Sequence, residues 1–260
     1  MKIPIYQVDA FTDKIFGGNP AAVCPLEKWI PAAAMQSIAM ENNLSETAFF
    51  VRKGSVFKIR WFTPAIEVDL CGHATLASAH VIFKHLGHAK PHITFLSKSG
   101  ELKASLKKDL IYLDFPAYDP IPVGSPPAAL LKGLGKKPKE VLKGRDYLAV
   151  FKTEADILAL QPDFAELNKL DCLGIIATAE GDESDFVSRF FAPRAGILED
   201  PVTGSAHTLL IPFWAKRLHK KKLYAFQLSK RRGELFCELQ GKRVLIGGHA
   251  RTFLKGTIAV

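Results

Sequence analysis

The stretch WFTPAIEVDLCGHATLASAHVIFKHL, residues Trp61 to Leu86, predicts how this chain is organised. It contains a Phe-x-Pro turn, a short acidic and apolar run, a glycine-containing turn of small residues, and then a helix-forming run. A second stretch, FFAPRAGILEDPVTGSAHTLLIPFWAKRL from Phe190 to Leu218, follows the same plan. Backbone N–H groups at such turns and helix starts can bind a carboxylate. We expect the two helix starts to face each other across an active site.

The spacing of the two stretches indicates an internal duplication. Phe62 and Phe191, which begin the two Phe-x-Pro turns, are 129 residues apart, and Gly72 and Gly204 are 132 residues apart. Both separations are close to half of the 260-residue chain. An internal repeat of this length predicts two similar lobes.

Prolines set the boundary between the predicted lobes. Several crowd the residues from Pro116 to Pro127, as is typical of a linker. We therefore assign residues 1–117 to the first lobe and 118–260 to the second.

Each lobe is predicted to combine strands with one apolar helix. The segments Ala74 to Leu86 and Ser205 to Leu218 are apolar on most faces, and such helices are normally buried. β-Branched and aromatic runs, such as Thr47 to Val51 and Val56 to Phe62, predict strands around the first helix. The sequence therefore predicts an α+β fold in which a sheet curls around a buried helix.

Composition narrows the classes of partner. The net charge of +9 comes largely from short basic runs of the kind found in surface loops, and no nucleic-acid-binding motif accompanies them. We therefore expect no nucleic-acid partner, and the positive charge could instead steer an anionic substrate. No apolar run approaches the roughly 20 residues that span a bilayer, and the N-terminal residues do not resemble a signal peptide. The sequence predicts a cytoplasmic protein without a membrane partner.

No motif for a cofactor stands out. The four cysteines are far apart and form no Cys-x-x-Cys pair, so neither a metal site nor a disulfide framework is indicated. The glycine-rich patterns of dinucleotide-binding and phosphate-binding loops are also missing from the sequence. We expect chemistry that needs no cofactor.

Four blocks of the sequence resemble the PhzF family of phenazine-biosynthesis-like isomerases, which is related in fold to diaminopimelate epimerase. The blocks are GGNPAAVC from residue 17, NLSETAFF from residue 43, DLCGHAT from residue 69 and EDPVTGSA from residue 199. The resemblance implies two lobes, each a barrel-like, mostly antiparallel sheet around a central helix, with the active site in the cleft. It also implies a homodimer, and a last strand, from about residue 252 to 260, that pairs with the first lobe.

The resemblance assigns catalysis to three residues. Glu46 matches the family's catalytic glutamate, which takes a proton from one carbon and returns it to another; otherwise it is a surface residue at a strand start. Such chemistry needs a carboxyl group whose pKa is raised by burial and by its neighbours. His73 and Asp200 match residues that line the family's pocket, and Asp200 could fix the tautomer or charge of His73. Their structural alternatives are a helix-cap or packing histidine and a turn aspartate.

Four further residues are candidates for substrate binding. Gly72, Gly204 and Ser205 lie at the predicted helix starts, where their N–H groups and the serine hydroxyl could bind a carboxylate. Alternatively, the glycines only satisfy the backbone geometry and Ser205 caps its helix. Asn19 matches another pocket position of the family, and is otherwise a turn residue.

The cysteines discriminate between two mechanisms. Related epimerases and racemases use two thiols, each at a Cys-Gly turn, but here only Cys71 precedes a glycine, and the second lobe has Asp200-Pro201-Val202. We therefore expect an isomerase that moves a proton and a double bond in a small carboxylate-bearing substrate, similar to trans-2,3-dihydro-3-hydroxyanthranilate isomerase. The alternatives are an amino-acid epimerase or racemase, and a small-molecule-binding protein without catalysis.

Overall fold

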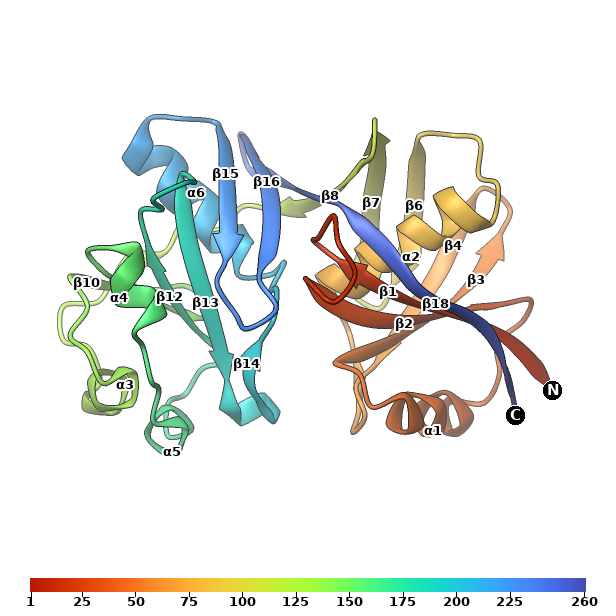
Figure 1. Ribbon diagram of the computed structural model, residues 1–260, viewed down its shortest axis with the longest axis horizontal. Helices are drawn as coiled ribbons and strands as arrows, with labels where there is room; N and C mark the ends of the chain where they lie inside the picture. Colours follow the sequence, from red (N-terminus) through yellow and green to blue (C-terminus); the bar gives the residue numbers. More distant parts are fainter. The chain divides into compact units, whose positions relative to one another are not determined.

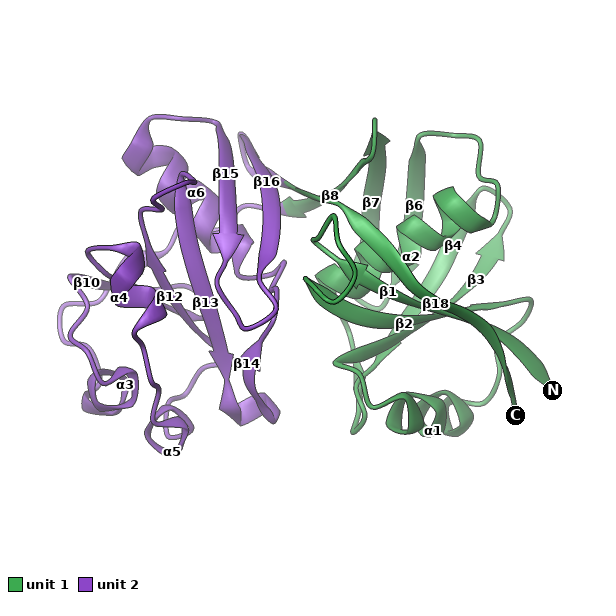
Figure 2. Ribbon diagram, in the orientation of Figure 1, with its two compact units in different colours: residues 1–115, 246–260 green, residues 116–245 purple.

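The computed structural model describes all 260 residues of the chain. They form two compact units, coloured separately in Figure 2. Unit 1 consists of residues 1–115 and 246–260, and unit 2 consists of residues 116–245. No helix of the protein is both long enough and apolar enough to cross a bilayer.

Unit 1 is a curled sheet with one helix inside it and one outside (Figure 1). Its elements are β1 (Lys2–Ala10), β2 (Asn19–Leu26), α1 (Ala32–Asn42), β3 (Glu46–Lys53), β4 (Val56–Phe62), β5 (Glu67–Val68), α2 (Gly72–His85), β6 (His92–Ser97), β7 (Gly100–Lys107), β8 (Leu110–Pro116) and β18 (Ala250–Ala259).

Most neighbouring strands of unit 1 are antiparallel. β1 pairs with β2 on one side and with β18 on the other, and the chain continues through β3 and β4 and then through β6, β7 and β8. The pairs β2–β3 and β4–β6 are parallel. The sheet therefore includes the last strand of the chain beside the first.

The two helices of unit 1 pack differently because their sequences differ. α2 is apolar on nearly every face and contacts β1, β2, β3, β7 and β18, so the sheet wraps around it. α1 buries only Met35, Ile38 and Ala39, which pack with Phe49 and Phe62 in a separate cluster. α2 is thus the central helix predicted from the sequence, and its first residues are held inside the sheet.

Unit 2 repeats this plan with shorter strands. Its elements are β9 (Ile121–Pro122), α3 (Ala128–Leu134), β10 (Glu140–Lys143), β11 (Tyr147–Val150), α4 (Glu154–Leu158), α5 (Phe164–Leu167), β12 (Ile175–Ala179), β13 (Phe186–Ala192), the 3₁₀ helix η1 (Pro193–Ala195), β14 (Ile197–Asp200), α6 (His207–Leu218), β15 (Lys222–Gln227), β16 (Gly233–Gln240) and β17 (Arg243–Gly248), which continues into unit 1.

Strand β13 is the centre of unit 2. It pairs antiparallel with β12 and β14 and parallel with β15, which in turn pairs with β16. The buried helix α6 contacts β15 and β16. It begins at His207, two residues later than predicted, because residues 204–206 form a turn instead.

Both units contain an arginine–glutamate pair whose arginine begins the same sequence pattern, Arg-x-Phe-x-Pro. Arg60 donates two hydrogen bonds to Glu67, of 2.7 and 2.8 Å, and its guanidinium lies 5.2 Å from the ring centroid of the phenylalanine two residues later. Arg189 donates two bonds to Glu199, of 2.7 and 2.9 Å, with the corresponding ring 5.0 Å away. The pairs join β4 to β5 and β13 to β14, so the two lobes are similar in detail, as the duplication predicted.

Candidate active site

Four of the predicted site residues lie at element starts within unit 1. Asn19 is the first residue of β2, and Glu46 is the first residue of β3. Gly72 and His73 begin α2. The parallel register of β2 and β3 pairs Ala21 with Glu46, so both strand starts lie at one end of the sheet, and α2 contacts both strands.

His73 contacts Glu46 through one ring nitrogen. The Nε2 atom lies 3.1 Å from Glu46 Oε2, and the two side chains are 6% and 12% exposed. The distance is that of an ion pair, although the N–H direction falls short of hydrogen-bond geometry. The catalytic candidates of the first lobe are therefore in direct contact and largely withdrawn from water.

The other ring nitrogen of His73 has two neighbours. Its Nδ1 atom lies 3.2 Å from Asn19 Nδ2 and 3.6 Å from Cys71 Sγ. A neutral ring would accept a hydrogen bond at Nδ1 from the amide nitrogen. A protonated ring donates at Nδ1 and requires the amide turned by 180°, so that the oxygen accepts. The orientation of the Asn19 amide is thus coupled to the proton on His73.

The charge of His73 follows from opposing effects. Burial alone lowers the pKa of His73, because it removes the charged ring from water, but the interactions of the ring with its acidic neighbours Cys71 and Glu46 outweigh it. The pKa of His73 is therefore raised well above its usual value. Burial also raises the pKa of the Cys71 thiol to about 11, so at neutral pH that thiol keeps its proton. Glu46 is then the acidic side chain that faces Nε2 of His73.

The same residues include three potential metal donors. One donor atom each of Glu46, Cys71 and His73 lies within 4.8 Å of the others. Nitrogen, oxygen and sulfur donors suit zinc, but the sulfur must be a thiolate and a fourth donor is needed. The high pKa of the Cys71 thiol and the direct contact between Glu46 and His73 favour a site for proton transfer over a metal site.

Unit 2 places Asp200, Gly204 and Ser205 around the turn that leads into α6. Asp200 ends β14 and is 9% exposed, and Thr203 donates to its Oδ2 atom at 2.5 Å. The alternative that Ser205 caps the helix is wrong, because the N-cap residue is Ala206 and no side chain caps it. Instead the Ser205 hydroxyl accepts a hydrogen bond from Arg145 Nη2 at 3.2 Å.

Sequence reasoning missed two residues that support this turn. Arg145 contacts Ser205 because Gly144 lets its loop approach α6: a Cβ atom at Gly144 would lie 2.5 Å from a side-chain atom of Leu209. Gln227 is fully buried at the end of β15 and is hydrogen-bonded to Thr203. Gly144, directly before Arg145, was a sequence signal for a close approach of this loop to α6, whereas Gln227 lies in no motif.

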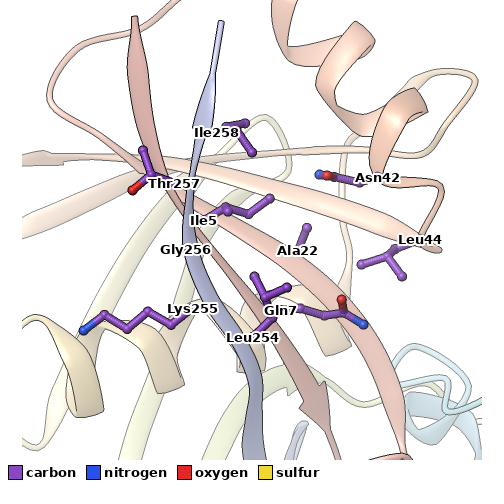
Figure 3. A pocket seen from close by; sticks show the side chains of 10 residues that line it. All are labelled: Ile5, Gln7, Ala22, Asn42, Leu44, Leu254, Lys255, Gly256, Thr257 and Ile258. Atoms are coloured by element: carbon purple, nitrogen blue, oxygen red, sulfur yellow. The ribbon is translucent and has the colours of Figure 1, made fainter.

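Two hollows, one in each unit, lie away from these residues. In unit 1, a hollow of about 370 Å³ lies beside β1 and β18 (Figure 3). Asn42 lines it and also donates to Thr47 at 3.0 Å, beside Glu46, but none of the predicted site residues reaches it. In unit 2, a hollow of about 530 Å³ is lined in part by the basic residues Lys216, His219, Lys220, Lys221 and Lys242.

Comparison with known proteins places the chain in a family. A family model described as phenazine biosynthesis-like protein matches residues 8–256. A Pseudomonas aeruginosa protein named an uncharacterized isomerase is 51% identical over 258 residues, which cover 99% of each chain. A mouse phenazine biosynthesis-like domain-containing protein is 42% identical over 292 residues, again covering 99% of each.

Solved structures agree with the predicted fold class. The crystal structure of a PhzF-family protein from Enterococcus faecalis has a TM-score of 0.98 at 49% identity and covers 100% of both chains. A hydroxyproline epimerase from Agrobacterium vitis has a TM-score of 0.63 at 10% identity, which shows a shared fold alone. The α+β fold of two similar lobes is thus confirmed. The chain belongs to the PhzC-PhzF family of phenazine biosynthesis-like proteins and is an enzyme of the isomerase class.

Proposed function

We propose that the protein is a cofactor-independent isomerase that moves a proton, and with it a double bond, in a small carboxylate-bearing molecule. The observation that carries this proposal is the buried contact between Glu46 and His73. A carboxylate beside an imidazolium, shielded from water, is suited to general acid–base catalysis. Family membership supports the reaction class.

In the proposed reaction, Glu46 removes a proton from a carbon next to a carbon–carbon double bond. The electron pair of the broken C–H bond forms a new double bond to the neighbouring carbon, and the π electrons of the old double bond move to the far carbon, which gives an anion delocalised over the allylic carbons. Glu46 then returns the same proton to the far carbon, so no atom is gained or lost. When the negative charge moves from Glu46 to the substrate, the nearby charge of His73 stabilises it.

The residues of unit 2 are assigned to binding and orientation. We propose that the N–H groups near Gly204 and the hydroxyl of Ser205 bind the substrate carboxylate, with Arg145 supplying positive charge to Ser205. Asp200 is proposed to contact a polar group of the substrate. In unit 1, Asn19 and Gly72 are assigned to the pocket around His73.

Substitution of the base tests this proposal. Wild type and the Glu46→Gln variant are compared on trans-2,3-dihydro-3-hydroxyanthranilate and on a panel of cyclic unsaturated carboxylic acids. We expect Glu46→Gln to lower kcat by about 100-fold or more, while the exposed Glu41→Gln control stays at the wild-type level.

The solvent isotope pattern is the second readout. In deuterated water the product should carry at most one deuterium, at the newly protonated carbon, because one carboxyl group does both transfers. Full turnover by Glu46→Gln would contradict the assignment. Inversion of an amino-acid α-carbon with deuterium uptake would favour the epimerase alternative instead.

We also propose that the protein forms a homodimer, as the family resemblance implies. Phe253 and Leu254 of β18 are 46% and 42% exposed, and Leu254 lines the hollow of Figure 3. Covering these side chains with a second copy would remove apolar surface from water. Light scattering should give twice the chain mass for wild type and the single mass for Leu254→Asp. A monomeric wild type would contradict the proposal.

A further inference from the structure

We propose that Gln227 and Thr203 are positioning residues that hold Asp200 as an ionised hydrogen-bond acceptor in a fixed orientation. This inference rests on the proposed function, because it explains how one of the proposed site residues is prepared for its work. All three residues belong to unit 2 and are nearly or fully buried. The contacts that support this inference involve the Gln227 amide, the Thr203 hydroxyl and the Asp200 carboxyl group.

The amide of Gln227 has only one possible orientation. Its Oε1 atom faces the backbone N–H of Thr203 at 2.8 Å, and its Nε2 atom faces the backbone carbonyl of Asp200 at 2.8 Å. An N–H can only donate and a carbonyl can only accept, so the two ends of the amide cannot be exchanged. The side chain is therefore a clamp that ties Asp200, at the end of β14, to Thr203 within the segment that leads into α6.

This orientation decides where the proton of the Thr203 hydroxyl points. Gln227 Nε2 also lies 3.2 Å from Thr203 Oγ1, and because Nε2 can only donate, the hydroxyl accepts there. The single hydroxyl proton is then free for Asp200 Oδ2, 2.5 Å away. A carboxyl oxygen that accepts a hydrogen bond is favoured in its ionised form. The chain of donors thus runs from Gln227 through Thr203 to Asp200.

The rest of the unit keeps this chain rigid. β13 lies between β14 and β15 and pairs Phe190 with Asp200 and Ser188 with Gln227. The ring of His207 contacts the Thr203 carbonyl through Nδ1 at 2.8 Å, which leaves neither backbone group of Thr203 unbound. Both ends of the donor chain are therefore fixed to the same sheet.

A glycine makes room for the turn. A Cβ atom at Gly233, opposite Gln227 on β16, would lie 2.2 Å from a side-chain atom of Val202. A side chain larger than hydrogen at that position would therefore have to displace the Val202 side chain, which belongs to the turn. The sequence of β16 is thus adapted to the clamp as well.

The decisive test removes the hydroxyl without changing the shape of the side chain. Thr203→Val abolishes the donor to Asp200, and Thr203→Ser restores it. The titration of Asp200 is followed by ¹³C NMR of protein labelled at aspartate carboxyl groups, with the resonance identified by its loss in Asp200→Asn. We expect the Asp200 pKa to rise in Thr203→Val and to return in Thr203→Ser. No rise in Thr203→Val would overturn the proposal, whatever the activity.

Kinetics provide a second arm. Loss of a hydrogen bond to a charged group should lower kcat by about 10- to 100-fold in Thr203→Val, with KM little changed. The acid limb of its pH profile should move to higher pH. Gln227→Glu keeps the acceptor for the Thr203 N–H but loses both donors, so the acid limb should move in the same direction. Thr94→Val, on strand β6 and outside every proposed site, is the matched control and should behave as wild type.

The outcomes separate this proposal from the proposed function. Full activity of Asp200→Asn would refute the role of Asp200 in the reaction while the NMR result still judges the clamp. If Asp200→Asn is inactive but Thr203→Val keeps the wild-type kcat and pH profile, the positioning role is wrong. Equal loss of kcat in Thr203→Val and Thr203→Ser, without a change in the pH profile, would indicate a merely structural role and would also overturn it.

Discussion

Replacing Arg189 by methionine should destabilise the protein more than replacing Arg60, although both arginines occupy the same place in the two lobes. Arg189 is 13% exposed, and besides its two bonds to Glu199 it donates to the backbone carbonyls of Ile157 and Leu160, at 3.2 and 2.9 Å. Methionine keeps the packing of the side chain but leaves these acceptors without their donor. The comparison therefore isolates the hydrogen bonds.

Replacing Arg60 removes fewer interactions than replacing Arg189. It is 26% exposed, and its partner Glu67 is also paired with Lys98 at 2.8 Å, so a cation remains beside the carboxylate after the substitution. Truncating one partner of a fully buried pair costs about 3–5 kcal/mol, whereas an exposed pair contributes about 0.2–1 kcal/mol. From the exposure and the number of acceptors we expect about 3 kcal/mol for Arg189→Met and about 1 kcal/mol for Arg60→Met.

Urea unfolding measures both values. Trp214 reports on unit 2, and Trp29 and Trp61 report on unit 1, so fluorescence is combined with circular dichroism to detect separate transitions. Arg60→Met should become more damaging in a Lys98→Met background, because no second cation remains. Equal losses for the two arginines, or a larger loss for Arg60, would refute the argument from backbone acceptors.

Three further predictions concern pH and packing. The pKa of His73 is raised in the folded protein, so the contribution of His73 to stability is complete below the ordinary histidine pKa of about 6.5. That contribution is lost as pH rises through the folded-state pKa. The urea midpoint should therefore fall from pH 6 to 9 in wild type, and should fall less in His73→Gln. Burial lowers the pKa of His80 to about 4, so the free energy of unfolding should fall as pH drops from about 6.5 towards 4. Thr252 contacts the neutral His80 ring at 2.9 Å, and Thr252→Val should lower the free energy of unfolding by about 1 kcal/mol at pH 7. Thermal melts measure both effects. Gly233→Ala should lower both Tm and activity because its methyl group would lie 2.2 Å from a valine, whereas Gly124→Ala, with nothing within 4 Å, should change neither.

The sequence predicted those parts of the fold that local chemistry determines. The central helix of the first lobe was expected from Ala74 to Leu86 and extends from Gly72 to His85, because its apolar residues leave no polar face. Strand β4 has the predicted bounds, since its β-branched and aromatic residues favour a strand wherever it packs.

Other elements depend on tertiary context. β2, Asn19–Leu26, contains two prolines and small residues, so its sequence indicates only a turn at its start. It is a strand because β1 and β3 pair with it on both sides. The start of α6 was predicted too early for a similar reason: the turn before it is held by Gln227, a residue distant in sequence.

The candidate site divides in the same way. The family motifs named Glu46 and His73, and the structure brings the two side chains into contact across 27 positions of sequence. No pattern could have found Gln227, because a buried amide on a strand is recognised only by the groups it meets. Thr203 lay within a recognised motif, but its role depends on the direction of one hydroxyl proton.

The return of β18 to the first strand has a consequence for synthesis of the protein. Unit 1 needs residues 250–259 to complete the sheet beside β1, whereas all residues of unit 2 lie between 116 and 245. On the ribosome, the earlier-made half of the sequence must therefore wait for the last strand, while the continuous unit can already fold. The lobe that holds Glu46 and His73 is begun first and finished last.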